Sequence, residues 1–144
     1  GAPGGGTGAP ARSGAGSVVL DVRRGDGPPA ARGYTFPAFV TADRRIADAP
    51  DEVAAAVRAI VAAQRMLKTD PSRAAGVGEK RFPAQEAGLI AELIERDLPY
   101  YDPSIPPETV ERMNAFAQRI GLLDGPVPYE AAVATRFAGL WTSS

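Results

Sequence analysis

The side chains that could do chemistry in this chain are acids, arginines and a short aromatic and hydroxyl cluster. There is no cysteine and no histidine among the 144 residues, which excludes thiol nucleophiles, Cys/His metal sites and acid–base catalysis by histidine. The carboxylates form no obvious pair: Glu92 and Glu95 are expected on a solvated helix face with Arg96. We therefore expect no enzyme, no catalytic residue, no cofactor and no metal site.

Four residues are candidates for binding a small ligand. Arg24 follows a short apolar segment, and ligands of α/β folds bind beyond the carboxyl ends of strands. Its guanidinium could therefore meet an anion, although a solvent-exposed loop arginine is the simpler interpretation. Tyr34, Thr35 and Phe36 could stack on a ligand or hydrogen-bond to it, or they could simply pack within a strand. Asp21 interrupts the apolar segment and either serves a site or points outward.

Two segments that would position these candidates have the composition of strands. Val18–Val22 is short, β-branched and bounded by turn-forming residues, which is typical of a buried strand. Tyr34–Ala42 is rich in aromatic and β-branched residues. Pro37 cannot donate to a strand ladder, so this second strand is expected at an edge, at a bulge or at a bend.

The best helix in the sequence is predicted over Asp48–Asp70. Its alanines favour helix, Asp48 is a predicted N-cap, and Pro50 suits the first turn. A preceding segment, 43–47, is predicted to form one short helical turn. The apolar stripe of the main helix has a 3.6-residue period and consists of Val53, Val57, Ile60, Val61, Gln64 and Leu67.

Four more helices are predicted after the main one. The segment Tyr129–Trp141 has a wide apolar face and should dock onto something large. Gly121 and Leu122 have the pattern of a helix stop. The four predicted ranges are 71–80, 83–97, 108–120 and 129–141.

Composition limits the partners and the compartment. Residues 1–17 are rich in Gly, Pro and Ala, which predicts a disordered segment. The net charge is −1, so no nucleic-acid partner is expected. No apolar run is long enough for a membrane helix. Residues 1–17 also lack the features of a signal peptide, so an exported protein would carry that signal upstream or would have lost it.

Two stretches resemble a known family of transport proteins. The order YTFPAFVTAD, a short turn and then PDEVAAAVRAIVAAQRMLKTDPSRAA is similar to the C-terminal half of ABC-importer substrate-binding proteins of the nitrate/sulfonate/taurine type, which includes thiamine-precursor-binding members. The later stretch MNAFAQRIGLLDGPVPYEAAV resembles the closing segment of that family. The matching positions of the first motif are Pro50, Val53, Asp70, Pro71 and Ala74.

This resemblance, which covers about residues 18–144, implies part of a type II periplasmic-binding fold of the α/β class. Two short strands, one in the second lobe and one crossing between lobes, would be followed by about five helices. The implied function is non-catalytic: an extracytoplasmic, periplasmic or cell-surface protein that binds a small anionic or heteroaromatic ligand between two lobes and delivers it to an ABC transporter permease. The chain departs from the family in length, because the strands of the N-terminal lobe are absent. That lobe or a partner chain would have to cover the apolar helix faces.

Two other classes of function remain open. Pyrimidine-precursor synthases share the same fold, but their catalytic residues include histidine, which this chain lacks. The second class is a helical protein-interaction module without a small-molecule ligand, in which a partner protein buries the apolar faces. Stabilisation by a ligand would favour the solute-binding protein, and stable self-association without a ligand response would favour the module.

Overall fold

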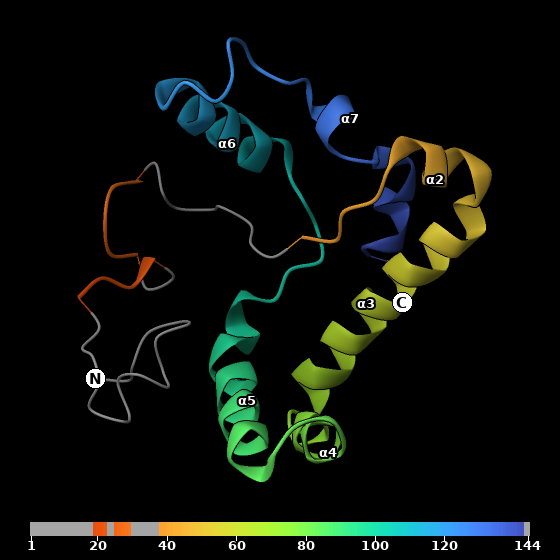
Figure 1. The fold of residues 1–144 in the computed structure, drawn as a ribbon, viewed down its shortest axis with the longest axis vertical. Coiled ribbons are helices and arrows are strands. Elements are labelled where there is room, and N and C mark those ends of the chain that lie inside the picture. The colour runs from red at the N-terminus through yellow and green to blue at the C-terminus, as the bar shows by residue number, and fades with distance from the viewer. Residues whose placement is uncertain (1–18, 23–24, 30–37, 143–144) are drawn as a thin grey trace. The chain divides into compact units, whose positions relative to one another are not determined.

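The computed structural model describes residues 19–22, 25–29 and 38–142, and this part of the chain is helical (Figure 1). Helix accounts for 67% of it, and it contains no strand. The segment 1–17, predicted to be disordered, lies outside the described residues. The helices are α2 (Asp43–Asp48), α3 (Pro50–Thr69), α4 (Arg73–Arg81), α5 (Ala84–Asp97), η3 (Leu98–Tyr100), α6 (Pro107–Arg119), α7 (Tyr129–Ala132) and η4 (Thr135–Leu140), where η denotes a 3-10 helix.

The predicted α/β fold with two short strands is wrong for the described residues. In the first strand segment, Val19 and Leu20 are 90% and 60% exposed, whereas Asp21 is buried, so the apolar side chains do not line a core. The Asp21 and Val22 carbonyls accept turn hydrogen bonds from Asp26 and Gly25. The described part of the second segment, 38–42, is also not a strand. A β-rich composition does not form a strand without a neighbouring strand to pair with.

The main helix is confirmed, with a different start. Ala49 separates α2 from α3 because the residue before a proline disfavours helical geometry, and its φ is −143° and its ψ 59°. Asp48, the predicted N-cap, is instead the last residue of α2. Its carboxylate accepts a hydrogen bond from the Arg44 Nε at 3.3 Å. In the predicted stripe Val53 and Val61 are buried, while Ile60 is 39% exposed.

Two compact units make up the chain. The first includes residues 63–101, with α4, α5 and η3. The second includes 38–62 and 102–142, with α2, α6, α7 and η4; α3 contributes to both. None of the helices in the described ranges combines the length and apolar character that a membrane span requires.

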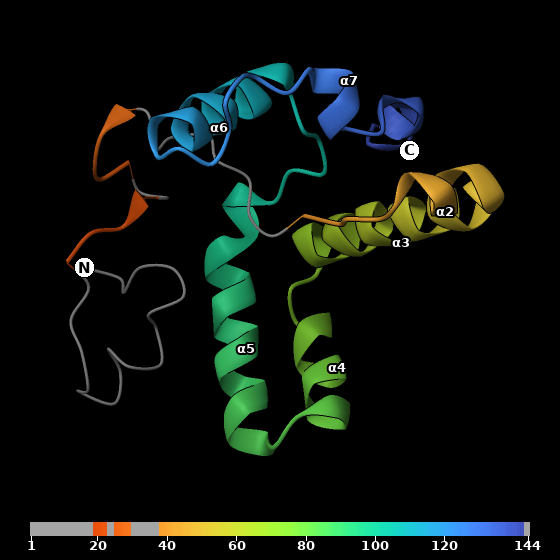
Figure 2. The same ribbon diagram turned by 45° about the horizontal axis from the view of Figure 1, so that its top comes forward.

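In the first unit, α4 and α5 form a helical hairpin and lie side by side (Figures 1 and 2). Their contact uses small residues: Ala74, Gly78 and Ala87 are buried. A Cβ atom on Gly78 would lie 3.3 Å from the Cβ and 3.4 Å from the Cα of Ala87. Glycine at position 78 therefore permits the close approach of the two helices.

In the second unit, the predicted helix stop after α6 is confirmed. Gly121 has a φ of +74°, and its N–H donates to Gln118 O at 3.1 Å while Leu122 N–H donates to Ala117 O at 2.8 Å. These two bonds define a Schellman motif, in which glycine is favoured because it adopts positive φ without strain.

The chain that returns from α6 is held by one side chain. The Asn114 amide donates to Val127 O at 2.8 Å and accepts from Val127 N–H at 3.0 Å. Farther on, the Tyr129 hydroxyl donates to Ile105 O at 2.6 Å. These hydrogen bonds join α6, the returning chain and α7 into one unit.

The predicted C-terminal helix is broken. Val133 is extended, with φ −122° and ψ 127°, and it separates α7 from η4. A β-branched residue favours this geometry. The predicted apolar positions are nonetheless inside: Val133 and Phe137 are each 7% exposed. The local periodicity identified the inward side chains but not the helix break.

Candidate protein-interaction surface

The four predicted ligand-binding residues cannot be placed in a site. Arg24, Tyr34, Thr35 and Phe36 all lie outside the described residues. Within the described ranges, no group of three His, Cys, Asp or Glu side chains is arranged to hold a metal ion. Among the described residues, the two features that stand out are a polar network at one helix corner and an unusual number of exposed apolar side chains.

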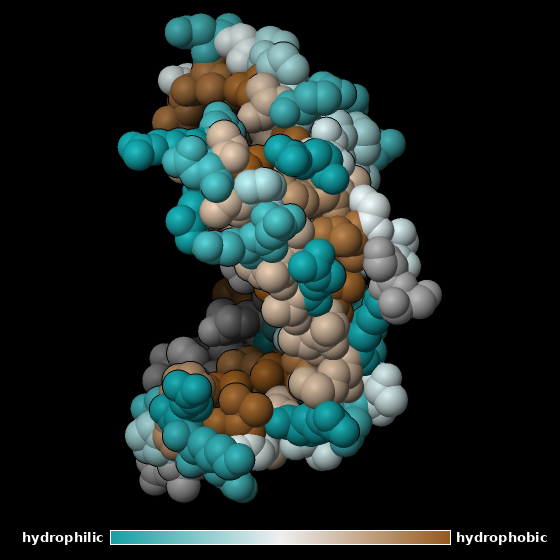
Figure 3. Space-filling view, turned by 90° about the vertical axis from the view of Figure 1, so that its right-hand side faces the viewer, coloured by the Kyte–Doolittle hydropathy of each residue, from teal (hydrophilic) through white to brown (hydrophobic). Residues whose placement is uncertain are grey.

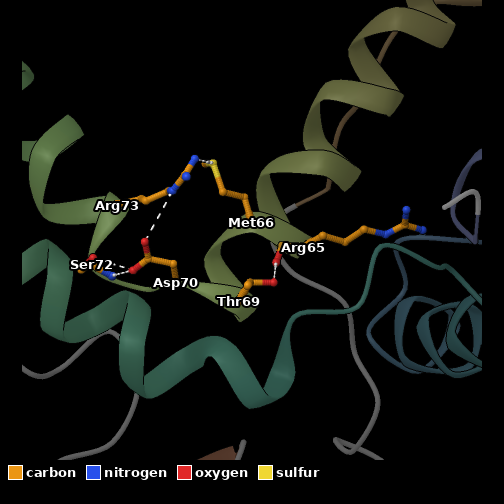
Figure 4. A network of polar contacts seen from close by, with 6 residues as sticks. All are labelled: Arg65, Met66, Thr69, Asp70, Ser72 and Arg73. Carbon is orange, nitrogen blue, oxygen red and sulfur yellow. Dashed lines mark hydrogen bonds and ion pairs between the residues drawn. The ribbon is translucent and has the colours of Figure 1, made fainter.

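The polar network lies between α3 and α4 and serves the turn of the chain (Figure 4). The Asp70 Oδ1 accepts hydrogen bonds from the Ser72 N–H and hydroxyl, and its Oδ2 lies 3.5 Å from the Arg73 Nε. The Arg73 guanidinium also contacts the Met66 sulfur at 3.3 Å. These donors, the Ser72 hydroxyl foremost, hold the pKa of Asp70 below its ordinary value of 3.8 against a smaller opposing desolvation effect.

The same local structure occurs a second time, which indicates that it is a local turn motif. Asp102 and Ser104 repeat the sequence Asp-Pro-Ser, and the Asp102 Oδ1 accepts from the Ser104 N–H at 2.9 Å and from its hydroxyl at 2.7 Å. An aspartate that bonds the backbone two residues onward stabilises a turn by itself. The lowered pKa of Asp70 thus follows from a local turn with exposed groups.

Apolar exposure is the second feature. Among the described residues, six hydrophobic side chains are buried, and none of the large buried side chains is less than 2% exposed. Thirteen large hydrophobic residues are exposed. In the space-filling view, brown hydrophobic side chains reach the surface among teal hydrophilic ones (Figure 3). Single exposed apolar residues are ordinary, but a surplus of them over buried ones indicates surfaces that meet another molecule.

Each unit carries part of this exposed apolar surface. In the first unit, Val77 of α4 is 58% exposed and Phe82, directly after α4, is 46% exposed. In the second unit, Ile120 and Leu122 at the end of α6 are 51% and 72% exposed. We name these two sets the hairpin patch (Val77, Phe82) and the α6-end patch (Ile120, Leu122).

Helix α5 shows the same deficit of burial. Its large apolar side chains, Leu89, Ile90, Leu93 and Ile94, are only half-buried. In α5, Ala87 is the one residue with a described side chain that is buried. An apolar helix face that one neighbour covers incompletely has room for another.

The exposed patches were not among the predicted sites. The apolar periodicity of the helices was recognisable, but periodicity only says which residues share a face. Whether that face meets another part of the chain depends on tertiary packing. The sequence did predict that a missing lobe or a partner chain covers the apolar helix faces.

The comparisons with known proteins add no assignment. No family model, no curated protein and no solved structure matches this chain.

Proposed function

We propose that this chain is a helical protein-interaction module, whose apolar patches are covered by a protein partner. The observation that carries the proposal is the excess of exposed over buried large hydrophobic side chains in the described residues. Removal of apolar surface from water stabilises by about 25 cal/mol per Å². The exposed apolar side chains do not gain this free energy when the described helices fold, but they can gain it when the chain associates with a partner.

Binding of a small solute for an ABC importer, with an extracytoplasmic location and a permease as partner, stays a prediction. Its candidate residues lie outside the described ones, and the α/β fold that the same family resemblance implies is not found in the described residues. By contrast, the exposed apolar side chains of the hairpin patch and the α6-end patch belong to the described residues and favour a macromolecular partner.

An apolar dye together with a ligand panel separates the two functions. A dye such as ANS, which fluoresces on apolar surfaces, should bind the folded chain. Thermal unfolding followed by the near-UV circular dichroism of Trp141 should be unchanged by nitrate, small sulfonates and pyrimidines. A compound that raises the unfolding temperature progressively as its concentration increases, without dye binding to the chain, would refute the module and support solute binding.

A pair of substitutions tests whether the patches are the dye-binding surface. Val77→Thr and Phe82→Ser in the hairpin patch should lower dye fluorescence while leaving helix content unchanged, because both side chains are exposed. The matched control is Val133→Thr, which places a hydroxyl at a position only 7% exposed and should reduce stability by about 1–3 kcal/mol. Unchanged dye binding in the double variant would contradict this assignment of the surface.

A further inference from the structure

The sulfur atom of Met66 lies beside a positively charged side chain at the corner between α3 and α4 (Figure 4). The Arg73 guanidinium donates to this sulfur from Nη1 at 3.3 Å, while its Nε lies 3.5 Å from the Asp70 carboxylate. One arginine thus contacts two acceptors of very different strength. A carboxylate is a strong acceptor, whereas a thioether is a weak one.

Met66 is also accessible to small reagents. It is 37% exposed, and the side chain of Arg73 beside it is 61% exposed. The chain has two methionines, and the other one, Met113 of α6, is half-buried. Because oxidation of a sulfur-containing side chain depends on its exposure, Met66 is the more accessible of the two methionines to a small oxidant.

We propose that Met66 is a site of oxidation by hydrogen peroxide and that the resulting sulfoxide tightens the corner between α3 and α4. A sulfur lone pair attacks one peroxide oxygen, so that an S–O bond forms and the O–O bond breaks. The departing oxygen takes the proton of the transferred oxygen and leaves as water. The sulfur is oxidised by two electrons and the peroxide is reduced by two. Met66 belongs to neither apolar patch, so this site does not depend on the proposed interaction function.

The direction of the effect follows from the surroundings of the sulfur. Oxidation converts the thioether into a polar group, and hydrogen bonds from a charged donor are stronger than those between neutral groups. Because Arg73 already donates to the Met66 sulfur, the new oxygen has a cationic donor beside it. A sulfoxide is disruptive where it brings a polar group into a core, but Met66 is exposed. Oxidation therefore strengthens the link between α3 and the first residue of α4.

Three backbone hydrogen bonds at the start of α4 report on this corner. The N–H groups of Arg73, Ala74 and Ala75 each donate to a carbonyl three residues earlier. Amide hydrogen exchange at these groups measures how often the corner opens. In the sulfoxide the exchange should be slower by about twofold to fivefold, which is the size expected for an exposed charged contact.

The experiment uses the full chain. In the unmodified chain, peptide mapping by mass spectrometry after peroxide treatment should show oxidation of Met66 before Met113. Exchange is then measured in a Met113→Leu variant, a volume-conserving change that leaves Met66 as the sole methionine. Adding Arg73→Ala should abolish the slowing caused by oxidation. The matched control is Arg81→Ala at the other end of α4, which should retain the slowing.

Two acceptor variants provide a test that needs neither oxidation nor the loss of Arg73. Met66→Gln places a permanent amide oxygen near the guanidinium, whereas Met66→Leu provides no acceptor. Exchange at the start of α4 should be slower in the glutamine variant than in the leucine variant, and peroxide should have no effect in the latter.

Several results would overturn the proposal. Oxidation of Met113 ahead of Met66 would overturn the assignment of the site. Exchange that is unchanged or faster in the Met66 sulfoxide would overturn its effect on the corner. Equal slowing with and without Arg73, or equal exchange in the glutamine and leucine variants, would show that the guanidinium does not receive the new oxygen.

Discussion

Alanine substitution of two glycines in α4 tests how closely α4 and α5 approach each other. A Cβ added to Gly76 would have no atom within 4 Å, whereas a Cβ added to Gly78 would lie 3.3 Å from the Ala87 Cβ. Alanine at either position should gain about 0.5–1 kcal/mol of helix stability from reduced backbone entropy in the unfolded chain. At Gly78 the gain is opposed by overpacking, which costs about 1–3 kcal/mol.

We therefore expect Gly76→Ala to stabilise the hairpin and Gly78→Ala to leave it unchanged or weaken it. The stability difference between the two variants should be about 1–3 kcal/mol, the size of the overpacking cost alone. The atoms that crowd the new methyl group are the Cβ and the Cα of Ala87. Neither atom is the end of a flexible side chain, so the helices themselves would have to move apart.

Amide hydrogen exchange over α4 and α5, followed by mass spectrometry, is the suitable assay because it reports the local stability of the hairpin. Fluorescence of Trp141 would report the other unit. A double-mutant cycle with Ala87→Gly supplies the control, since removing that methyl group should reduce the penalty of Gly78→Ala. Equal stabilisation by the two alanines, within about 0.5 kcal/mol, would refute the close approach of the two helices.

Three further predictions concern local structures elsewhere in the chain. Asn114→Ala removes both hydrogen bonds to Val127 and should lower stability by about 1–3 kcal/mol, measured by urea unfolding followed by Trp141 fluorescence. In the same assay Gly121→Ala, at a φ of +74°, should cost about 1–2 kcal/mol, and Gly121→Asn should cost less; equal loss in both would argue against the left-handed helix stop. The Ser72 hydroxyl lowers the pKa of Asp70 below 3.8, so the contribution of Asp70 to stability should be complete above pH 5 or so and should disappear as the pH falls through the folded-state pKa. Asp70→Asn should remove this part of the acid dependence of hydrogen exchange in α4, and an unchanged pH profile would contradict the assigned hydrogen bonds.

The sequence was sufficient to locate the main helix and the end of α6. The period of Val53, Val57 and Val61 identified α3, and two of these valines are buried in the structure. Gly121 and Leu122 identified the end of α6, because a Schellman motif depends on one residue with positive φ and on bonds within a few residues. Such features follow from local backbone geometry, which neighbouring residues in the chain determine.

Tertiary information was needed to see that the two predicted strands are not formed in the described residues and that the C-terminal helix is broken. The segments 18–22 and 34–42 have strand-like composition, but a strand forms only where a second strand supplies hydrogen bonds. In the described parts of these segments no such neighbour is present. Val133 fits a helical stripe, yet its backbone is extended while its side chain remains buried. A helical backbone and an extended backbone can both bury this side chain, so the apolar periodicity could not show which conformation Val133 adopts.

The sequence by itself determined which side chains share a helix face and which charges each helix carries. Only the tertiary structure decided that Gly78 meets Ala87 and that Val77 is left exposed. The physical reason is that helix formation depends on residues three and four positions apart, whereas burial depends on residues that are distant in the chain. An interaction surface is defined by the apolar area that distant packing leaves uncovered, and for this reason it emerged from the structure.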